Sequence, residues 1–117
     1  MADDYRQIDL ALPQSPDIER NVLGAILNDS PGTDQALAAL GPSDFFVTDN
    51  ATIFRRVKEQ VGRGDRPDLV LLYDTLTAHG EIDKITGGAG FIAGLSDGIP
   101  RVCPLNRWVE LLLTKSS

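Results

Sequence analysis

The chain has 117 residues and a formal net charge of -6, and these two values already restrict what it can be. One compact domain is the common outcome at this length, and 42% hydrophobic residues suit a globular fold. The single cysteine, Cys103, excludes an internal disulfide and favours a reducing, cytoplasmic setting. No apolar run approaches the roughly 20 residues of a membrane helix, and an acidic chain is poorly suited to gripping a phosphate backbone. We therefore expect neither membrane insertion nor strong nucleic-acid binding.

The first half of the chain predicts two helices after a polar start. Residues 1–14 lack a helical period, so we interpret them as a flexible leader. Ser15 is a favoured N-cap residue and Pro16 suits the first helical position, so a helix is expected over 16–28. Its apolar stripe comprises Ile18, Val22, Leu23, Ala25, Ile26 and Leu27. A second, shorter helix follows a turn, with Thr33 or Asp34 as its cap.

The middle of the chain combines two adjacent aromatic residues with two longer helices. Neighbouring side chains on a helix lie about 100° apart, so one of Phe45 and Phe46 is expected in the core and the other at its edge. Thr48 or Asp49 would open the next helix. The helix after it, capped by Asp68, is apolar on nearly every side, which predicts that it is the central helix.

The last third of the chain predicts a short glycine-rich helix and a longer one that follows Pro104. No segment alternates apolar and polar residues as a half-buried strand would. The sequence therefore predicts an all-α fold, a compact orthogonal bundle of about five or six short helices.

Three features of the sequence could carry chemistry, and each has a more ordinary interpretation. Gly88-Ala89-Gly90 matches a loose dinucleotide fingerprint, but no apolar strand precedes it. His79, the only histidine, precedes a glycine and suits a hydrogen bond to the last carbonyls of a helix. Cys103 has no histidine nearby, which favours a structural role. We expect no catalytic residue, no cofactor-binding residue and no metal ligand in this chain.

The last helix carries more apolar side chains than a terminal helix usually buries. The candidate residues for self-association are Leu105, Trp108, Leu111 and Leu112. Two interpretations remain open at this point. The helix either packs entirely into the core of its own domain, or it turns one face toward a second chain or toward a missing segment, since aromatic side chains dominate binding at interfaces.

A basic stretch interrupts the otherwise acidic chain. Arg55, Arg56 and Lys58 lie close together on a predicted helix. Such a stretch is most often the solvated face of a helix, and the alternative is a docking patch for an acidic partner.

Several short motifs follow one another over about residues 12–115. They are Leu12-Pro13, Glu19 to Leu27, Asp44-Phe45-Phe46, Ile53-Phe54, Pro67 to Val70, Gly87-Gly88 with Phe91 and Leu95, and Trp108-Val109 with Leu111-Leu112. In order and spacing, this set resembles the N-terminal domain of bacterial replicative DNA helicases of the DnaB type. In that family a long hairpin of two helices would begin near Pro104, and the resemblance implies that this sequence truncates it.

The resemblance implies a domain that is not itself an enzyme. It would assemble with copies of itself into a collar and dock primase, as part of an ATP-dependent DNA helicase. ATP and magnesium are expected only in the motor domain, which these residues do not include. The implied boundaries are a leader over 1–14, a globular helical head over 15–103, and the start of the hairpin helix or a linker over 104–117. A stand-alone adaptor or phage-type regulator with the same head is the alternative.

Overall fold

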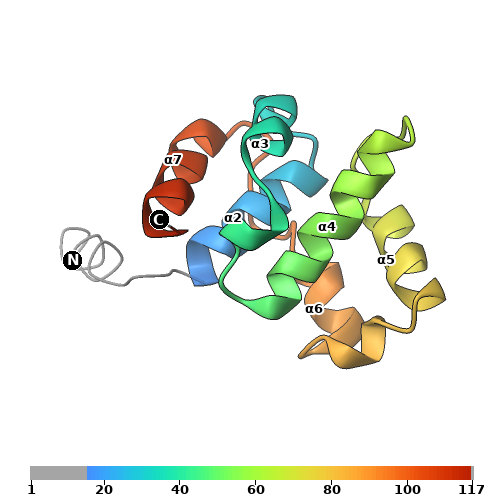
Figure 1. Ribbon diagram of the computed structural model, residues 1–117. Helices are drawn as coiled ribbons and strands as arrows, with labels where there is room; N and C mark the ends of the chain where they lie inside the picture. The colour runs from blue at the N-terminus through green and yellow to red at the C-terminus, as the bar shows by residue number, and fades with distance from the viewer. Residues whose placement is uncertain (1–15, 117) are drawn as a thin grey trace.

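The computed structural model describes residues 16–116, and every regular element in this range is helical (Figure 1). The described elements are α2 (Pro16–Leu27), α3 (Thr33–Ala39), the 3-10 helix η1 (Pro42–Asp44), α4 (Thr48–Gly62), α5 (Leu69–Ala78), the 3-10 helix η2 (Ile82–Lys84), α6 (Gly88–Gly94) and α7 (Leu105–Ser116). The predicted all-α bundle is confirmed. The leader predicted over 1–14 and the Ser15 cap lie outside the described residues.

None of the helices within residues 16–116 is long and apolar enough to span a membrane.

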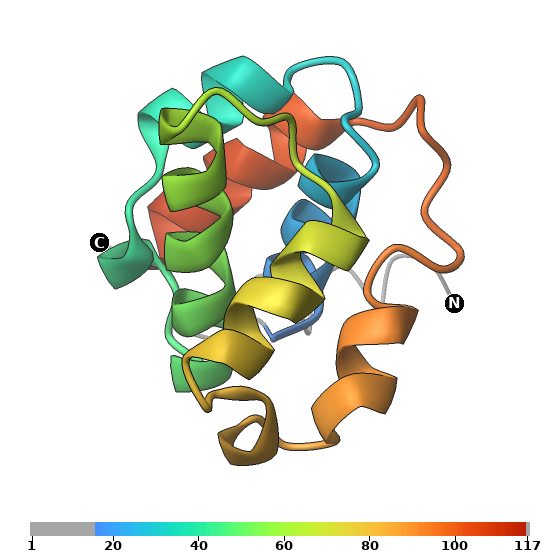
Figure 2. The same ribbon diagram turned by 90° about the vertical axis from the view of Figure 1, so that its right-hand side faces the viewer.

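Helix α2 is the centre of the bundle. It contacts α3, α4 and α7, and it lies behind α4 and α5 in Figure 2. Eight of its 12 residues are buried, and Val22, Leu23 and Ile26 have no exposed surface. The apolar stripe predicted from the sequence is therefore buried on several sides, because α3, α4 and α7 each pack against α2.

Helix α5 was predicted to be the central helix, and this prediction is wrong. The helix lies at the edge of the molecule, on the side opposite α7 (Figure 1). Leu72 and Leu76 are buried, whereas Val70 is 75% exposed and Tyr73 is 42% exposed. Among the described elements, α5 makes its main contacts with α4, α6 and η2. An all-round apolar sequence allows burial on every side, but neighbouring helices have to be present to provide it.

The two adjacent phenylalanines face different environments, as predicted, but for a different reason. Phe45 is buried and its ring lies 4.9 Å from that of Phe54, whereas Phe46 is 67% exposed. Phe45 follows η1 with extended backbone angles rather than helical ones. Successive side chains of an extended segment point to opposite sides, which separates the two rings more completely than a helix would.

A buried carboxylate from α2 accepts hydrogen bonds from the backbone at the beginning of α4. Helix α4 begins at Thr48, as predicted, and its N-cap residue is Val47, whose side chain cannot accept a hydrogen bond. Instead, Glu19 accepts hydrogen bonds from the backbone N–H of Phe46 at 2.7 Å and of Val47 at 3.3 Å. The first turn of a helix leaves backbone donors without partners, and a negative charge is favourable there. Glu19, 27 residues away from Phe46, thus accepts the N–H groups of the N-cap residue and of the residue before it, and places a carboxylate at the N-terminus of α4.

Two other helix starts show how far local sequence specifies a cap. Asp68 caps α5 as predicted, because its Oδ1 accepts a hydrogen bond from the N–H of Leu71 at 2.9 Å. Helix α3 begins after Gly32, which has a positive φ of 96°, so the predicted cap at Thr33 or Asp34 is wrong. The Thr33 hydroxyl instead donates a hydrogen bond to the Ser30 carbonyl at 2.6 Å.

The segment between α6 and α7 crosses α2 at very short range. Gly24 packs against the backbone of Leu95, where an added Cβ would lie 2.3 Å from the carbonyl oxygen. One turn further along α2, Asn28 Nδ2 donates a hydrogen bond to the carbonyl of Ile99 at 3.0 Å. These two residues attach the crossing segment to the central helix, so Gly24 is needed for close packing.

Candidate functional site

The four residues predicted for self-association divide into two pairs in the structure. Leu105 and Leu112 are 1% and 2% exposed and belong to the core of this chain. Trp108 and Leu111 are half-buried and lie three residues apart on one flank of α7. Because α7 packs on α2 and α3, its inner side is buried within this chain. Of the four candidate residues, Trp108 and Leu111 are therefore the two that remain accessible to a second chain.

The outer side of α7 is polar. Arg107 and Glu110 are exposed and form an ion pair at 3.4 Å. The Trp108–Leu111 flank thus lies between the buried stripe and a charged side. A partly buried aromatic ring suits contact with protein, since it offers a large apolar area.

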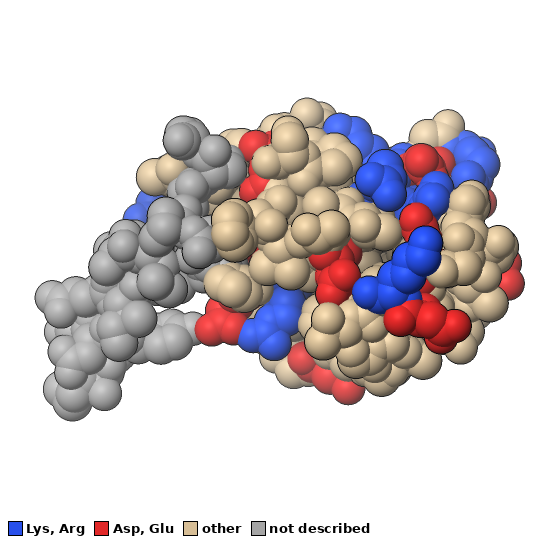
Figure 3. Space-filling view, turned by 60° about the horizontal axis from the view of Figure 1, so that its bottom comes forward, with Lys and Arg blue, Asp and Glu red and all other residues tan. Residues whose placement is uncertain are grey.

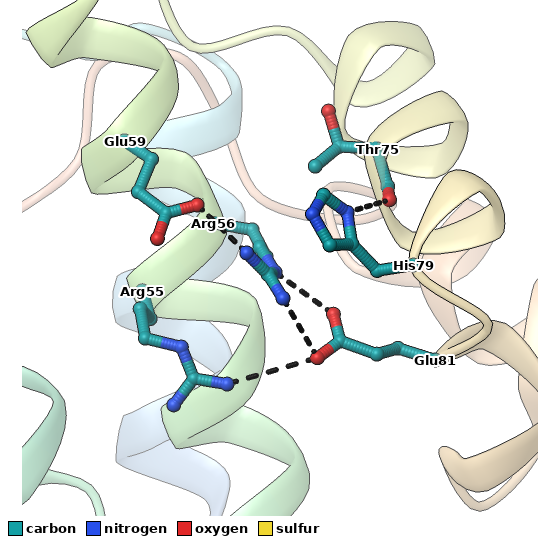
Figure 4. Close-up of polar contacts among 6 residues, drawn as sticks. All are labelled: Arg55, Arg56, Glu59, Thr75, His79 and Glu81. Carbon is teal, nitrogen blue, oxygen red and sulfur yellow. Dashed lines mark hydrogen bonds and ion pairs between the residues drawn. The ribbon is translucent and has the colours of Figure 1, made fainter.

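The central residue of the predicted basic patch is used inside the domain (Figure 4). Arg56 donates two hydrogen bonds to Glu81, from Nε to Oε1 at 2.8 Å and from Nη2 to Oε2 at 3.0 Å. It also donates one from Nη1 to Glu59 at 2.9 Å. These contacts raise the pKa of Arg56 and, through the Arg56 hydrogen bonds above all, lower the pKa of Glu81.

The other two residues of the basic patch differ in how accessible they are. Lys58 donates a hydrogen bond to the Leu40 carbonyl at 2.8 Å and lies over the Phe54 ring. Arg55 is 47% exposed in its side chain and lies 3.7 Å from Glu81, at the longer end of the ion-pair range. Figure 3 shows Lys and Arg side chains lying beside Asp and Glu side chains on the face it presents. Arg55 is therefore the member of the patch most available to a partner.

The residues considered for other chemistry lie apart from one another. His79 Nδ1 contacts the Thr75 carbonyl at 2.9 Å, which agrees with the predicted role at the end of α5 (Figure 4). Within the described part of the chain, no group of three or more His, Cys, Asp and Glu side chains could hold a metal ion. Gly88 and Gly90 lie inside α6 and follow η2, whereas a dinucleotide loop follows a strand.

Three tertiary ion pairs have no signal in the local sequence. Besides Arg56 and Glu81, Arg66 binds Asp29 at 2.6 Å and Asp34 at 3.0 Å, which ties the α4–α5 connection to the turn before α3 and to the first residues of α3. The hydrogen bond from Arg66 lowers the pKa of Asp29. Asp29 also has a positive φ of 51°, a conformation that Asp and Asn tolerate better than most residues. No local pattern could have paired these residues, because they are 37 positions apart in the chain.

The structure is a small all-α domain whose helices pack around α2. It has an apolar flank on α7, and several of its charged side chains form ion pairs within the domain. The chain belongs to the family described as the DnaB-like helicase N terminal domain, whose model matches residues 11–113. That domain does not contain the ATPase motor of the helicase.

The similarity extends to individual proteins and to a solved structure. The chain is 29% identical over 100 residues to the replicative DNA helicase DnaB of Treponema pallidum (strain Nichols), covering 86% of this chain and 23% of that protein. It is 30% identical over 104 residues to the Geobacillus stearothermophilus DnaB, covering 89% of this chain and 23% of the relative. The crystal structure of the N-terminal domain of DnaB helicase from Mycobacterium tuberculosis matches with a TM-score of 0.78 at 25% identity, covering 89% of this chain and 74% of that one. The chain thus spans about a quarter of the length of these helicases.

Proposed function

We propose that this domain is the non-catalytic assembly and docking head of a replicative DNA helicase, joining copies of itself into a collar and binding primase. Family membership supports the proposal, because the similar proteins are replicative DNA helicases. Unwinding of DNA belongs, in this proposal, to the larger protein. The observation that carries the assembly role is the half-buried flank of Trp108 and Leu111 on α7.

The flank is suited to a second copy because two other sides of α7 already have partners within this chain. Leu105, Val109 and Leu112 form the stripe that packs into the core. Arg107 and Glu110 pair with each other on the outer side. A Trp ring brings a large apolar area at a small cost in conformational entropy, and such residues contribute most to binding at interfaces.

Sedimentation equilibrium over a wide range of protein concentration tests the assembly role. Trp108→Ser with Leu111→Ser should weaken association of the chain by about tenfold or more, which corresponds to about 1.4 kcal/mol. Glu110→Ala is the matched control on the same helix and should associate as the wild type does. A wild-type chain that remains monomeric at every concentration contradicts the proposal.

Arg55 provides the test of primase docking. Arg55→Glu should weaken binding to primase from the same organism, because the side chain is exposed and only loosely paired with Glu81. Arg107→Glu, on α7, is the control for a change of net charge of the same size. Equal affinities of wild type and Arg55→Glu would remove this surface from the proposal.

A further inference from the structure

A groove crosses the first turns of α2, between α6 and the beginning of α4. It consists of two hollows of about 360 and 400 Å³ that share Arg20 and Phe91 in their walls. Leu95 and Ile99 add apolar surface to the first hollow, and Pro16 lies in the wall of the second. The groove therefore begins where the chain enters α2.

One wall of the groove is a strip of α6 without side chains. Gly90 and Gly94 lie one helical turn apart and both border the first hollow. A Cβ added at either position would meet no atom within 4 Å, in contrast to the clash at Gly24. Glycine inside a helix costs roughly 0.5–1 kcal/mol relative to alanine. Packing among the described residues does not require glycine at positions 90 and 94, because both positions have room for a Cβ. The open strip therefore suits close approach by a further segment of backbone.

The second hollow contains a buried acceptor without a partner. Asn50 borders this hollow and is 2% exposed. Its Nδ2 donates a hydrogen bond to Glu19 Oε1 at 2.9 Å, while its Oδ1 has no hydrogen-bond partner among the described residues. A buried acceptor left unpaired costs about 1–3 kcal/mol. After a small rotation of the Asn50 side chain toward the hollow, the N–H group of a peptide lying there would satisfy it.

We propose that residues 10–14 of the same chain, Leu10-Ala11-Leu12-Pro13-Gln14, bind in this groove. These residues lie outside the described range, and Pro16, two positions after Gln14, lies in the wall of the second hollow. Leu10 and Leu12 alternate, so an extended segment presents both to one side, toward the apolar wall. Five extended residues span about 17 Å, enough to follow a groove of this kind.

Charge and the extent of the family domain favour this occupant. The rim of the groove carries Asp17, Asp49 and Asp97, and the only basic residue there, Arg20, is paired with Asp17. Residues 10–14 have no charge, so they avoid the repulsion that an acidic segment would meet. The family model also begins at residue 11, ahead of α2, which makes residues 11–14 of this segment part of the domain rather than an appendage.

A disulfide trap in the full chain tests the proposal directly. In a Cys103→Ser background, Leu12→Cys is combined with Gly90→Cys or with Gly94→Cys. The matched control combines Leu12→Cys with Gly62→Cys, because position 62 is equally open and lies at the far end of α4. At least one groove pair should form the disulfide tenfold faster than the control pair. Equal rates for all pairs overturn the proposal.

A second measurement keeps the proposal testable if the cysteine variants fold poorly. Leu12→Asp in the full chain should shift the amide NMR signals of Gly90, Phe91 and Gly94, and the side-chain amide signal of Asn50. Gln7→Asp, which adds the same charge outside the segment, should leave those signals unchanged. Signals that ignore Leu12→Asp but move with protein concentration would show that a second copy fills the groove, and the proposal would then be wrong.

Discussion

Arg56 of α4 holds Glu81 with two parallel hydrogen bonds of 2.8 and 3.0 Å, which tie α4 to the segment that joins α5 to η2. Charge-assisted bidentate pairs of this kind are stronger and more directional than neutral hydrogen bonds. Both side chains are less than one-fifth exposed, so solvent screens the pair only partly. A residue that the sequence assigned to a partner surface thus acts mainly in holding the edge helix α5 in place.

The pair predicts a contrast between neighbouring arginines. Arg56→Ala should lower the free energy of unfolding by about 1.5 kcal/mol, because the half-buried Glu81 loses its principal partner. Arg55→Ala should change it by less than about 0.5 kcal/mol, as is usual for an exposed ion pair. Urea unfolding of the two variants measures both values. Losses of equal size would show that the geometry of the Arg56 pair does not matter.

The same pair predicts a pH dependence of stability. Arg56 lowers the pKa of Glu81 in the folded state, so the unfolded chain binds a proton more readily than the folded one. Stability from this pair is therefore complete above the ordinary Glu pKa of 4.5 and is lost as the pH falls through the lower, folded-state pKa. The difference in unfolding free energy between wild type and Glu81→Gln should shrink from about pH 6 to about pH 3. Asp29→Asn should behave similarly, since Arg66 lowers the pKa of Asp29.

Close packing at Gly24 predicts a strong effect of a single methyl group. Gly24→Ala places a Cβ 2.3 Å from the Leu95 carbonyl oxygen, which forces the crossing segment away from α2. We expect a loss of about 1–3 kcal/mol despite the better helix propensity of alanine. Gly62→Ala is the control, because that helical position is open, and it should be neutral or slightly stabilising. Thermal unfolding of both variants decides whether the close approach or the propensity dominates.

The contacts of Glu19 predict a loss of stability on substitution that its place within a helix would not suggest. Glu19→Ala leaves the N–H groups of Phe46 and Val47 and the side-chain amide of Asn50 without their acceptor. The expected loss is about 3 kcal/mol, more than for removal of an ordinary N-cap. Glu59→Ala, a change of the same type on the exposed side of α4, should cost much less. Hydrogen exchange at the Phe46 and Val47 amides should also accelerate in Glu19→Ala and not in the control.

Local sequence was sufficient wherever the deciding interactions are local. The Asp68 cap and the contact of His79 with Thr75 each depend on residues within four positions of one another. The same reasoning failed at α5, whose apolar outer side is not covered by any helix of the described residues, and it had no means of finding the contact of Glu19 with the segment before α4. Periodicity indicates which face of a helix is apolar, but it does not indicate which other helix packs against that face.

The sequence by itself determined the all-α class, the position of most helices and, through the order of its motifs, the helicase N-terminal family. These follow from helical periodicity, turn chemistry and capping, which act over a few residues. Only the tertiary structure decided that α2 is central, that Leu105 and Leu112 belong to the core, and that Arg56 is paired internally. The physical reason is distance along the chain: those outcomes depend on groups 25 or more residues apart, whose meeting is set by how whole helices pack.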